Sequence, residues 1–324
     1  MTENDLHIVT GAAGFVGRCL VKRLLDAGGI VIGLDNFCRG TQHNIAEFLP
    51  NSRFSIVRVD LSDCTALDAA MARAIAHHDV ASTTVWHMAA NSDIPAGVSD
   101  TGIDLRDTFM TTYNVVHLMR KYGLKKLAFA STSAVYGPLE SELHEDIGPL
   151  FPISNYGAMK LGSEGIVSAA VESFLEQAWI YRFPNVIGPF ATHGVIYDFS
   201  RKLRRNASEL EVLGDGNQQK AYLLVDELVD AMLFIRHQAK DRINCFNIGP
   251  ADEGVTVRFI AEETVRVAAP NATIRYTGGA KGWVGDVPKF TYSSRKLMRL
   301  GWTPKTASAD AIRAAVPVIW KESE

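Results

Sequence analysis

Cysteine is scarce in this chain, which has four cysteines in 324 residues and no C-x-x-C pair. Scattered thiols of this kind provide neither a disulfide framework nor a zinc site, and the nine histidines show no metal-ligand spacing. Long apolar runs are also missing, since no segment approaches the roughly 18 uninterrupted apolar residues that a membrane span requires. The polar N-terminus lacks the basic and apolar regions of a signal peptide. We therefore expect a cytoplasmic, metal-free protein without membrane contact.

An excess of charge of one sign is missing as well. The chain has 33 lysines and arginines against 36 aspartates and glutamates, with a net charge of −3 and a pI near 6.3. Without a basic run it has no electrostatic footprint for nucleic acid. Hydrophobic residues make up 47% of the chain, which is typical of an ordinary globular protein with a sizeable core.

Short β-branched runs alternate with amphipathic stretches of helical length in the first half of the chain. The runs that predict strands are 6–10, 30–35, 54–60, 84–89, 126–131 and 179–183. The stretches that predict helices include 16–27, 66–77, 104–122 and 156–176. Continuous apolar strands with room for crossover helices are typical of a parallel sheet that is buried on both faces. We predict an α/β fold with a doubly wound parallel (Rossmann) sheet and a smaller α/β domain on its C-terminal side.

Three glycines follow the first predicted strand directly, as Gly11-Ala-Ala-Gly14-Phe-Val-Gly17, and a predicted helix begins among them. The first glycine permits a tight turn, the second lets backbone approach a pyrophosphate, and the third lets helix and strand pack closely. The helix N-terminus adds N–H groups and a positive dipole for phosphates. The spacing is G-x-x-G-x-x-G rather than G-x-G-x-x-G, and a glycine triplet alone is also compatible with a purely structural turn.

Asp35 ends the second predicted strand, eighteen residues beyond Gly17, and supports a dinucleotide site. A carboxylate there accepts hydrogen bonds from the adenosine ribose and repels a 2′-phosphate, which favours NAD over NADP. Arg39 lies nearby and keeps NADP open. Asp60 and Leu61, at the end of the third predicted strand, are candidates for an adenine contact, with plain capping as the alternative for Asp60. We expect residues 1–182 to form the NAD-binding domain, to which the chain returns around 222–247, and 183–324 to form mainly a substrate-binding domain.

Tyr156 and Lys160 form a Tyr-x-x-x-Lys pair on a predicted helix, so that phenol and ammonium share one face. A tyrosine with a pKa of about 10 is a poor base at neutral pH, and an adjacent cation that stabilises phenolate makes general-base chemistry possible. Upstream, Ser131-Thr132-Ser133 follows the fifth predicted strand, where such sheets place ligand-binding residues. The pair alone is common, but this order of glycine turn, strand-end hydroxyls and Tyr-x-x-x-Lys helix is specific.

These residues resemble the extended short-chain dehydrogenases/reductases, specifically the NAD-dependent nucleotide-sugar epimerase/dehydratase group and its UDP-glucose/UDP-galactose 4-epimerase-like members. The resemblance covers nearly the whole chain. Besides the glycine motif and the Tyr156/Lys160 pair, its motifs are Leu34-Asp-Asn36, Asp60-Leu61, His87-Met-Ala-Ala90, Ser131-Thr-Ser-Ala-Val-Tyr-Gly137, Arg182-Phe-Pro-Asn-Val-Ile-Gly-Pro189, Gly214-Asp-Gly-Asn-Gln218, Asn247-Ile-Gly249 and Leu300-Gly-Trp302.

The resemblance implies a catalytic role for Thr132, for Tyr156 as acid/base and for Lys160 as its cationic partner. The NAD contacts that it implies are Gly11, Gly14, Phe15, Val16, Gly17, Asp35, Asn36, Asp60, Leu61, Met88, Ala89, Ala90, Ala130, Tyr156, Lys160 and Phe183. The candidates for contact with a nucleoside-diphosphate sugar are Asn91, Ser92, Ser133, Asn185, His193, Lys220, Lys281 and Trp283. It also implies a homodimer through a bundle of the 104–122 and 156–176 helices, with burial inside one subunit as the alternative.

The chain departs from the family at positions that decide substrate choice. In the dehydratase branch an Asp-Glu pair follows the catalytic threonine, whereas this chain has Ser133 and Ala134, which disfavours 4,6-dehydration. Lys220 and Trp283 stand where arginines usually clamp the diphosphate, and lysine does not reproduce the bidentate fork of arginine. Lys220 and Lys281 can supply point charges instead. Trp283 can stack on a base or sugar, or can be a buried structural residue.

Three further positions have open roles. His193 follows the Asn185 motif and is a candidate acid or hydrogen bonder for the sugar, with an inert loop histidine as the alternative. His87 ends the fourth predicted strand, and we expect it to have a structural or backbone-orienting role rather than to transfer protons. Thr108 stands where the family often has an asparagine near the cofactor.

We expect an NAD-dependent nucleotide-sugar 4-epimerase that inverts C4 of an NDP-hexose through a transient 4-keto intermediate. The main alternative is an NAD(H)-linked NDP-sugar 4-dehydrogenase or 4-keto-sugar reductase, which would use the same residues but exchange its cofactor in every turnover. A non-catalytic NAD-binding regulator is a third reading. The presence of Thr132, Tyr156 and Lys160 together disfavours that third reading.

Overall fold

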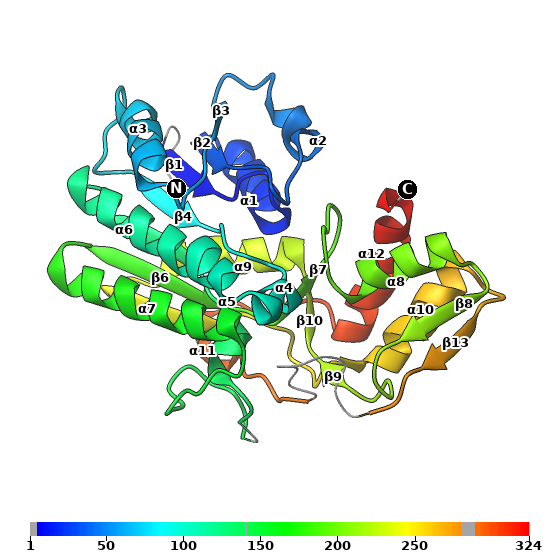
Figure 1. The fold of residues 1–324 in the computed structure, drawn as a ribbon. Coiled ribbons are helices and arrows are strands. Elements are labelled where there is room, and N and C mark those ends of the chain that lie inside the picture. Colours follow the sequence, from blue (N-terminus) through cyan, green and yellow to red (C-terminus); the bar gives the residue numbers. More distant parts are fainter. Residues whose placement is uncertain (1–4, 140, 280–288, 324) are drawn as a thin grey trace.

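The computed structural model describes residues 5–139, 141–279 and 289–323. Its central sheet has seven strands in the order β11-β6-β5-β4-β1-β2-β3 (Figure 1). These strands are β1 (Leu6–Thr10), β2 (Ile30–Asp35), β3 (Phe54–Arg58), β4 (Thr84–His87), β5 (Lys126–Ala130), β6 (Gln177–Arg182) and β11 (Ile243–Asn247). Every neighbouring pair is parallel. The predicted α/β fold with a doubly wound parallel sheet is confirmed.

Helices cover both faces of this sheet because successive residues of a strand point to opposite sides. Val9 of β1 shares one core with α1 (Phe15–Asp26) and α9 (Val225–Gln238). Its neighbour Ile8 shares the other core with residues of α3 (Cys64–Ile75), α6 (Thr111–Lys121) and α7 (Asn155–Ser173). All five residues of β1 are buried, which explains why this strand reads as a continuous apolar run.

The order of the strands changes direction at β1. From β1 the chain adds β2 and β3 on one side, and it then returns to place β4 on the other side. Thr10 and His87, the last residues of β1 and β4, are register partners. Ligands of doubly wound sheets bind outside the carboxyl ends of the strands at such a switch point. The turn after β1 and the segment after β4 therefore flank the expected binding position.

A second core lies beside the sheet and uses residues between Ile187 and Ile319. Its strands form three pairs, namely β7 (Asn185–Ile187) with β10 (Tyr222–Leu224), β8 (Glu209–Val212) with β13 (Thr273–Tyr276), and β9 (Gln219–Lys220) with β12 (Val255–Thr256). Helices α8 (Val195–Arg205), α10 (Val257–Ala268) and α12 (Ser308–Glu322) pack on one another there. Figure 1 shows β7 and β10 on the side of this second part that faces the sheet. We propose the domain division at 182/183, with α9 and β11 belonging to the sheet domain.

One stacked contact joins the two parts. The guanidinium carbon of Arg18, in the first turn of α1, lies 3.5 Å from the ring centroid of Phe190. The N–H of Phe190 donates to the carboxylate of Glu322, at the end of α12, over 2.6 Å. Arg18 also forms an ion pair with Glu47. The start of α1, the segment after β7 and the end of α12 are thus held together.

Short elements complete the fold. The structure also shows that two predicted helices begin at other residues than expected. They are α2 (Gln42–Ile45), η1 (Ala46–Phe48), α4 (Ile94–Ser99), α5 (Thr101–Asp104), the π-helical turn η2 (Leu105–Met110), η3 (Ser133–Tyr136) and α11 (Arg295–Leu300). The helix predicted from 104 is divided into the end of α5, η2 and α6. The helix predicted from 66 begins at Cys64, because Asp63 accepts the N–H groups of Thr65 and Ala66, each at 3.0 Å.

Within 5–139, 141–279 and 289–323, no helix has the length and apolar character needed to cross a membrane. The same residues contain no group of three or more His, Cys, Asp and Glu side chains that could hold a metal ion.

Two glycines of α7 should respond to alanine in opposite directions. A Cβ at Gly165 meets no neighbour within 4 Å, so Gly165→Ala should raise the free energy of unfolding by about 0.5–1 kcal/mol. A Cβ at Gly157 would lie 2.6 Å from the carbonyl oxygen of Ala134, so Gly157→Ala should lower it by about 1–3 kcal/mol. Urea unfolding of both variants measures the difference, and shifts of the same sign would contradict the packing of α7 on η3.

Candidate active site

The glycine turn after β1 leaves no room for side chains. Gly11 has a φ of +67°, a region that favours glycine. A Cβ at Gly17 would lie 1.9 Å from the carbonyl oxygen of Gly11, and a Cβ at Gly11 would lie 2.9 Å from the nitrogen of Ala89. Helix α1 begins at Phe15, and its N-cap residue Gly14 supplies no capping side chain. The N–H groups of its first turn, including those of Phe15 and Val16, are thereby left for a phosphate, which fits a dinucleotide.

Asp35, predicted to bind the ribose, also holds the glycine turn in place. Its Oδ2 accepts the N–H of Ala13 at 2.9 Å, and its Oδ1 accepts the N–H of Phe37 at 2.7 Å. Burial raises the pKa of the Asp35 carboxyl, although both N–H groups lower it. Each carboxylate oxygen can accept a second hydrogen bond, so this role is compatible with a ribose contact.

Arg39, the residue that left NADP as an alternative cofactor in the sequence, forms an ion pair with a carboxylate. Its Nη2 lies 2.6 Å from Oδ2 of Asp93, in the loop after β4. A guanidinium that is paired with a carboxylate offers less of its charge to a 2′-phosphate. The ion pair therefore agrees with a preference for NAD.

The remaining residues predicted near the adenosine lie at the ends of β2 and β3. Oδ1 of Asn36 accepts the N–H of Cys38 at 3.0 Å. Oδ1 of Asp60 accepts the N–H of Ser62 at 2.9 Å and its hydroxyl at 2.8 Å, and Leu61 is buried. Asp60 thus caps the turn after β3, and its contact with adenine remains a prediction.

The segment after β4 is tied to the end of β1. Met88 donates its N–H to the carbonyl oxygen of Thr10 at 3.3 Å, and Ala89 donates its N–H to the Thr10 hydroxyl at 3.2 Å. Met88, Ala89 and Ala90 are half-buried. Together with the contact between Gly11 and Ala89, these bonds place the three predicted cofactor residues at the switch point.

The side chain of Asn91 is used within the chain. Its Nδ2 donates to the carbonyl oxygen of Asp93 at 2.9 Å and to Oδ1 of Asp104 at 2.8 Å, and its Oδ1 accepts the N–H of Asp93 at 2.9 Å. Asp104 is fully buried, and its Oδ2 has no partner among the residues that the structure describes. A substrate contact by the Asn91 amide would replace one of these bonds, whereas the neighbouring Ser92 is only half-buried.

Thr132, Tyr156 and Lys160 come together at the carboxyl end of β5. Thr132 lies two residues beyond β5, and its hydroxyl acts on the phenol of Tyr156 and lowers the pKa of that phenol. Lys160 lies one turn further along α7 and is 1% exposed. Its Nζ donates to the carbonyl oxygen of Ala130 at 2.6 Å and lies 6.0 Å from the centroid of the Tyr156 ring. A cluster of a hydroxyl, a phenol and an amine can bind an alcohol and exchange the proton of that alcohol.

Burial controls protonation in this cluster. It raises the pKa of Tyr156 to about 12, although the hydrogen bond from Thr132 lowers it. It lowers the pKa of Lys160 to about 7, although the charge of Glu164 raises it. The expected stabilisation of phenolate by Lys160 is not seen in the chain alone, because desolvation penalises both charged forms. A further positive charge beside the phenol is needed to favour the phenolate.

A buried ion pair beneath the cluster was missed by the sequence analysis. The side chains of Glu164 and Arg182 are each 8% exposed and lie 2.6 Å apart. Ser131 donates its hydroxyl to Glu164, and Arg182 donates to the hydroxyl of Tyr136 at 3.0 Å. The available signal was a glutamate one turn beyond Lys160 on the same face of the helix. The pair holds the strand end that leads into the catalytic hydroxyls.

Ser133 and Phe183, two residues predicted to contact different ligands, touch each other. The backbone N–H of Ser133 donates to the carbonyl oxygen of Phe183 at 3.0 Å. Asn185 begins β7, where its Nδ2 lies 3.5 Å from the carbonyl oxygen of Ala221. These three predicted residues therefore follow β5 and β6 at the edge that carries Thr132.

The other predicted substrate residues lie apart. Lys220 is in β9 of the second part. His193 precedes α8, and the charges of Arg39 and Asp93 act on its ring. Lys281 and Trp283 lie outside the described residues. No described contact connects His193 to Tyr156, so its role at the sugar stays a prediction.

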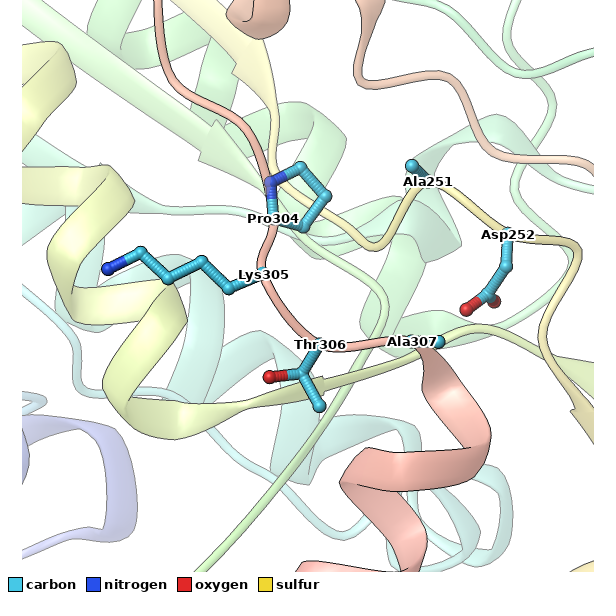
Figure 2. Close-up of a pocket in the computed structure, with 6 residues that line it drawn as sticks. All are labelled: Ala251, Asp252, Pro304, Lys305, Thr306 and Ala307. Carbon is cyan, nitrogen blue, oxygen red and sulfur yellow. The ribbon is translucent and has the colours of Figure 1, made fainter.

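A hollow elsewhere on the surface is not the active site. Figure 2 shows it lined by Ala251, Asp252, Pro304, Lys305, Thr306 and Ala307. The carboxylate of Asp252 is already used there, since it accepts the N–H and the hydroxyl of Ser308, each at 2.6 Å. None of the lining residues belongs to the predicted site. The hollow is a gap at the start of α12 whose acidic group is satisfied.

Comparison with known proteins agrees with this geometry. Residues 7–249 match the model of the NAD dependent epimerase/dehydratase family. The chain belongs to this family. Its cofactor is accordingly NAD, and the glycine turn, the uncapped start of α1 and Asp35 are the residues that fit it. The predicted family and cofactor are confirmed.

Members of the family match over almost the full length. The crystal structure of a UDP-galactose 4-epimerase has a TM-score of 0.84 at 32% identity, covering 98% of this chain and 99% of that one. A UDP-glucose 4-epimerase of Thermus thermophilus in complex with NAD has a TM-score of 0.83 at 29% identity, covering 97% and 98%. A putative UDP-glucose 4-epimerase of Methanocaldococcus jannaschii is 28% identical, covering 95% and 96%. Relatives at 24–28% identity include both UDP-sugar 4-epimerases and UDP-glucuronic acid decarboxylases.

Release of Arg39 from its partner should weaken the preference for NAD. In the Asp93→Asn variant the amide oxygen can still cap α4 through the N–H of Ala96, but the ion pair with Arg39 is lost. We expect the ratio of NADP to NAD affinity to rise several-fold, with NAD still preferred because Asp35 is retained. Titration with both nucleotides measures the ratio. Adding Arg39→Met should abolish the gain, and a gain that persists would show that Arg39 is not its source.

The buried amine of Lys160 should give stability a characteristic dependence on pH. Its pKa is lowered from 10.5 to about 7 in the folded chain, so between these values the unfolded chain binds a proton that the folded chain does not. The free energy of unfolding should therefore rise with pH across this window. In Lys160→Met this contribution is absent. Urea unfolding of both ligand-free proteins at pH 7, 8.5 and 10 measures the difference between their free energies of unfolding. We expect this difference to change steadily with pH, and a constant difference would contradict a buried, deprotonated amine.

Proposed function

We propose that this protein is an NAD-dependent nucleotide-sugar 4-epimerase, which inverts C4 of an NDP-hexose through a transient 4-keto intermediate. The observation that carries the proposal is the Thr132–Tyr156–Lys160 cluster at the end of β5, one strand away from the switch point between β1 and β4. Family membership and the 4-epimerases among its relatives support it.

The side chains have distinct tasks in this reaction. Tyr156 takes the proton of the C4 hydroxyl and later returns it, while the hydroxyl of Thr132 donates a hydrogen bond to the same oxygen. Lys160, held by the carbonyl oxygen of Ala130, lies beside the Tyr156 ring and adds its positive charge there when it is protonated. NAD, held by the glycine turn, the start of α1 and Asp35, would supply the hydride chemistry at C4, and its oxidised ring would supply the positive charge that the buried phenol lacks.

The residues after Thr132 favour epimerisation over dehydration. Ser133 and Ala134 occupy the first turn of η3, and Ala134 donates its N–H to the Thr132 hydroxyl oxygen at 3.1 Å. Neither side chain is an acid that could protonate a leaving hydroxyl at C6. We therefore expect a 4-keto hexose formed at this site to be reduced back to an alcohol rather than dehydrated.

The nucleotide part of the substrate would be held by the second part of the molecule. We propose Asn185, His193 and Lys220 as contacts there, with Lys281 and Trp283 as further candidates, and Ser92 and Ser133 on the sheet side. The names of the relatives favour a UDP-hexose. We also propose a homodimer through α6 and α7, since Tyr113 on α6 is 46% exposed and stacks flat on His117.

Proton NMR in D2O tests the proposal against its alternatives. The purified protein, without added cofactor, is incubated with a panel of UDP- and other NDP-hexoses. The expected result is a C4 epimer without deuterium in the ring, because hydride returns directly to the carbon that it left. Turnover only after addition of NADH or a keto acid would instead establish the net redox enzyme. Carbon dioxide release from a UDP-hexuronate would establish a decarboxylase.

Loss of the Tyr156 phenol should abolish turnover without loss of cofactor. Tyr156→Phe removes the hydroxyl that exchanges the C4 proton, and we expect a rate decrease of about 10²–10⁴-fold. Bound NAD, measured by its release on denaturation, should be unchanged. The matched control is Tyr276→Phe, on β13 of the second part, which should keep near-normal turnover. Near-normal turnover in Tyr156→Phe would overturn the proposed role.

A further inference from the structure

A fully buried histidine bridges the two strands at the switch point. His87 is the last residue of β4 and has no exposed surface. Its Nδ1 lies 2.7 Å from the hydroxyl of Thr10, its register partner on β1. The same hydroxyl accepts the N–H of Ala89 at 3.2 Å. Two hydrogen bonds through one hydroxyl therefore connect the imidazole to the first anchored N–H of the 89–91 segment.

The other ring nitrogen reaches the second anchor of that segment. Nε2 of His87 lies 3.1 Å from the hydroxyl of Thr112, on α6. Thr112 donates its hydroxyl to the carbonyl oxygen of Thr108 at 2.9 Å. The hydroxyl oxygen of Thr108 accepts the N–H of Asn91 at 3.1 Å. His87 is thus connected to both ends of the segment 89–91, through Thr10 on one side and through Thr112 and Thr108 on the other.

The charge of the ring follows from its surroundings. Burial, and the positive charge of Lys160, lower the pKa of His87 to about 3, so the imidazole is neutral at physiological pH. A neutral imidazole has one donor and one acceptor nitrogen. The ring also lies flat against Phe129, with centroids 5.9 Å apart and planes at 24°. Nζ of Lys160 lies 4.8 Å from the centroid of the same phenyl ring.

One tautomer completes every bond in the chain. If Nε2 carries the proton, Ala89 donates to Thr10, Thr10 donates to Nδ1, Nε2 donates to Thr112, and Thr112 donates to Thr108. If Nδ1 carries the proton, the Thr10 hydrogen loses its acceptor, and Thr112 must choose between the ring and the carbonyl oxygen of Thr108. Buried polar groups are nearly always paired, so the Nε2–H form is favoured.

The segment 89–91 lies where the redox end of the cofactor has to pass. The glycine turn contacts Ala89, and Asp35 marks the adenosine side on β2. Thr132 and Tyr156 mark the reacting side after β5, and β4 is the strand between β1 and β5. A dinucleotide that spans from β2 to β5 must therefore cross the end of β4.

We propose that His87 is a positioning residue for the nicotinamide end of NAD: as the neutral Nε2–H tautomer it links Thr10 to Thr112 and so fixes the Ala89–Asn91 segment against which that end binds. The proposal rests on NAD binding and is independent of which sugar reacts.

Comparison of a whole cofactor with its adenosine half tests this role. NADH and ADP-ribose both use the glycine turn and Asp35, but only NADH carries the nicotinamide. In the full chain freed of nucleotide, His87→Phe keeps a flat ring beside Phe129 and removes both hydrogen bonds. We expect the Kd for NADH to rise at least tenfold and the Kd for ADP-ribose to change less than twofold. Equal changes, or no change for NADH, would overturn the proposal.

Variants of the partner residue keep the test decisive if His87→Phe folds poorly. Thr112→Val removes the hydroxyl at the Nε2 side and should raise the ratio of the NADH Kd to the ADP-ribose Kd, as His87→Phe does. Thr112→Ser keeps a hydroxyl and should have the same ratio as the unmodified protein. The matched control is His7→Phe, because His7 is a second fully buried histidine whose pKa burial lowers to about 3. It lies in β1 beside Trp86 and should leave the ratio unchanged.

The tautomer can be observed directly by side-chain ¹⁵N NMR of histidine-labelled protein. The signal that disappears in His87→Phe should show a protonated Nε2 and an unprotonated Nδ1 from pH 5 to 9. An Nδ1–H form, or titration within this range, would overturn the hydrogen-bond chain. Neither readout depends on turnover, so the proposal can fail while the 4-epimerase function holds, and the reverse.

Discussion

The absence of a side chain at position 17 is the constraint from which the rest of the site follows. The carbonyl oxygen of Gly11 occupies the space that a Cβ would need, so α1 can lie close against the end of β1. The N-cap residue Gly14 has no side chain to cap the start of α1, so the first N–H groups of the helix remain available at the switch point. The close approach also brings Gly11 against Ala89, which links the turn after β1 to the segment after β4. Phosphate binding and cofactor orientation therefore depend on one close packing of backbone on backbone.

Desolvation, rather than attraction between opposite charges, sets the resting state of the catalytic cluster. The phenol of Tyr156 is held protonated and the amine of Lys160 loses much of its affinity for a proton, so the chain alone keeps a nearly neutral site. Glu164, which is paired with Arg182 beneath the cluster, has a negative charge that partly restores the affinity of Lys160 for a proton. In the proposed mechanism the phenolate forms only when a bound positive charge favours it, so that the chemistry depends on cofactor binding.

Patterns that depend on local spacing could be predicted from the sequence. The continuous apolar runs located the first six strands of the sheet. The four-residue spacing between Tyr156 and Lys160 correctly predicted that they share one face of a helix. Partners far apart in the chain could not be predicted, because a single sequence does not show which side chains meet. Glu164 meets Arg182 from another element, and the amide of Asn91 is used by Asp104 rather than being open to a ligand. The π-helical turn in η2 likewise has no signal in apolar periodicity.

The stack of Arg18 on Phe190 couples the positions of the two halves of the molecule. Arg18 follows the last glycine of the cofactor turn, and Phe190 follows the Asn185 strand and is fastened to the final helix by Glu322. A displacement of the second part relative to the sheet must therefore move or break this contact. Because thermodynamic linkage is reciprocal, a ligand that orders one side of the stack changes the affinity for a ligand on the other side by the same factor in both directions. Through this contact, a ligand bound beside the glycine turn and a ligand bound by the second part can influence one another within one polypeptide.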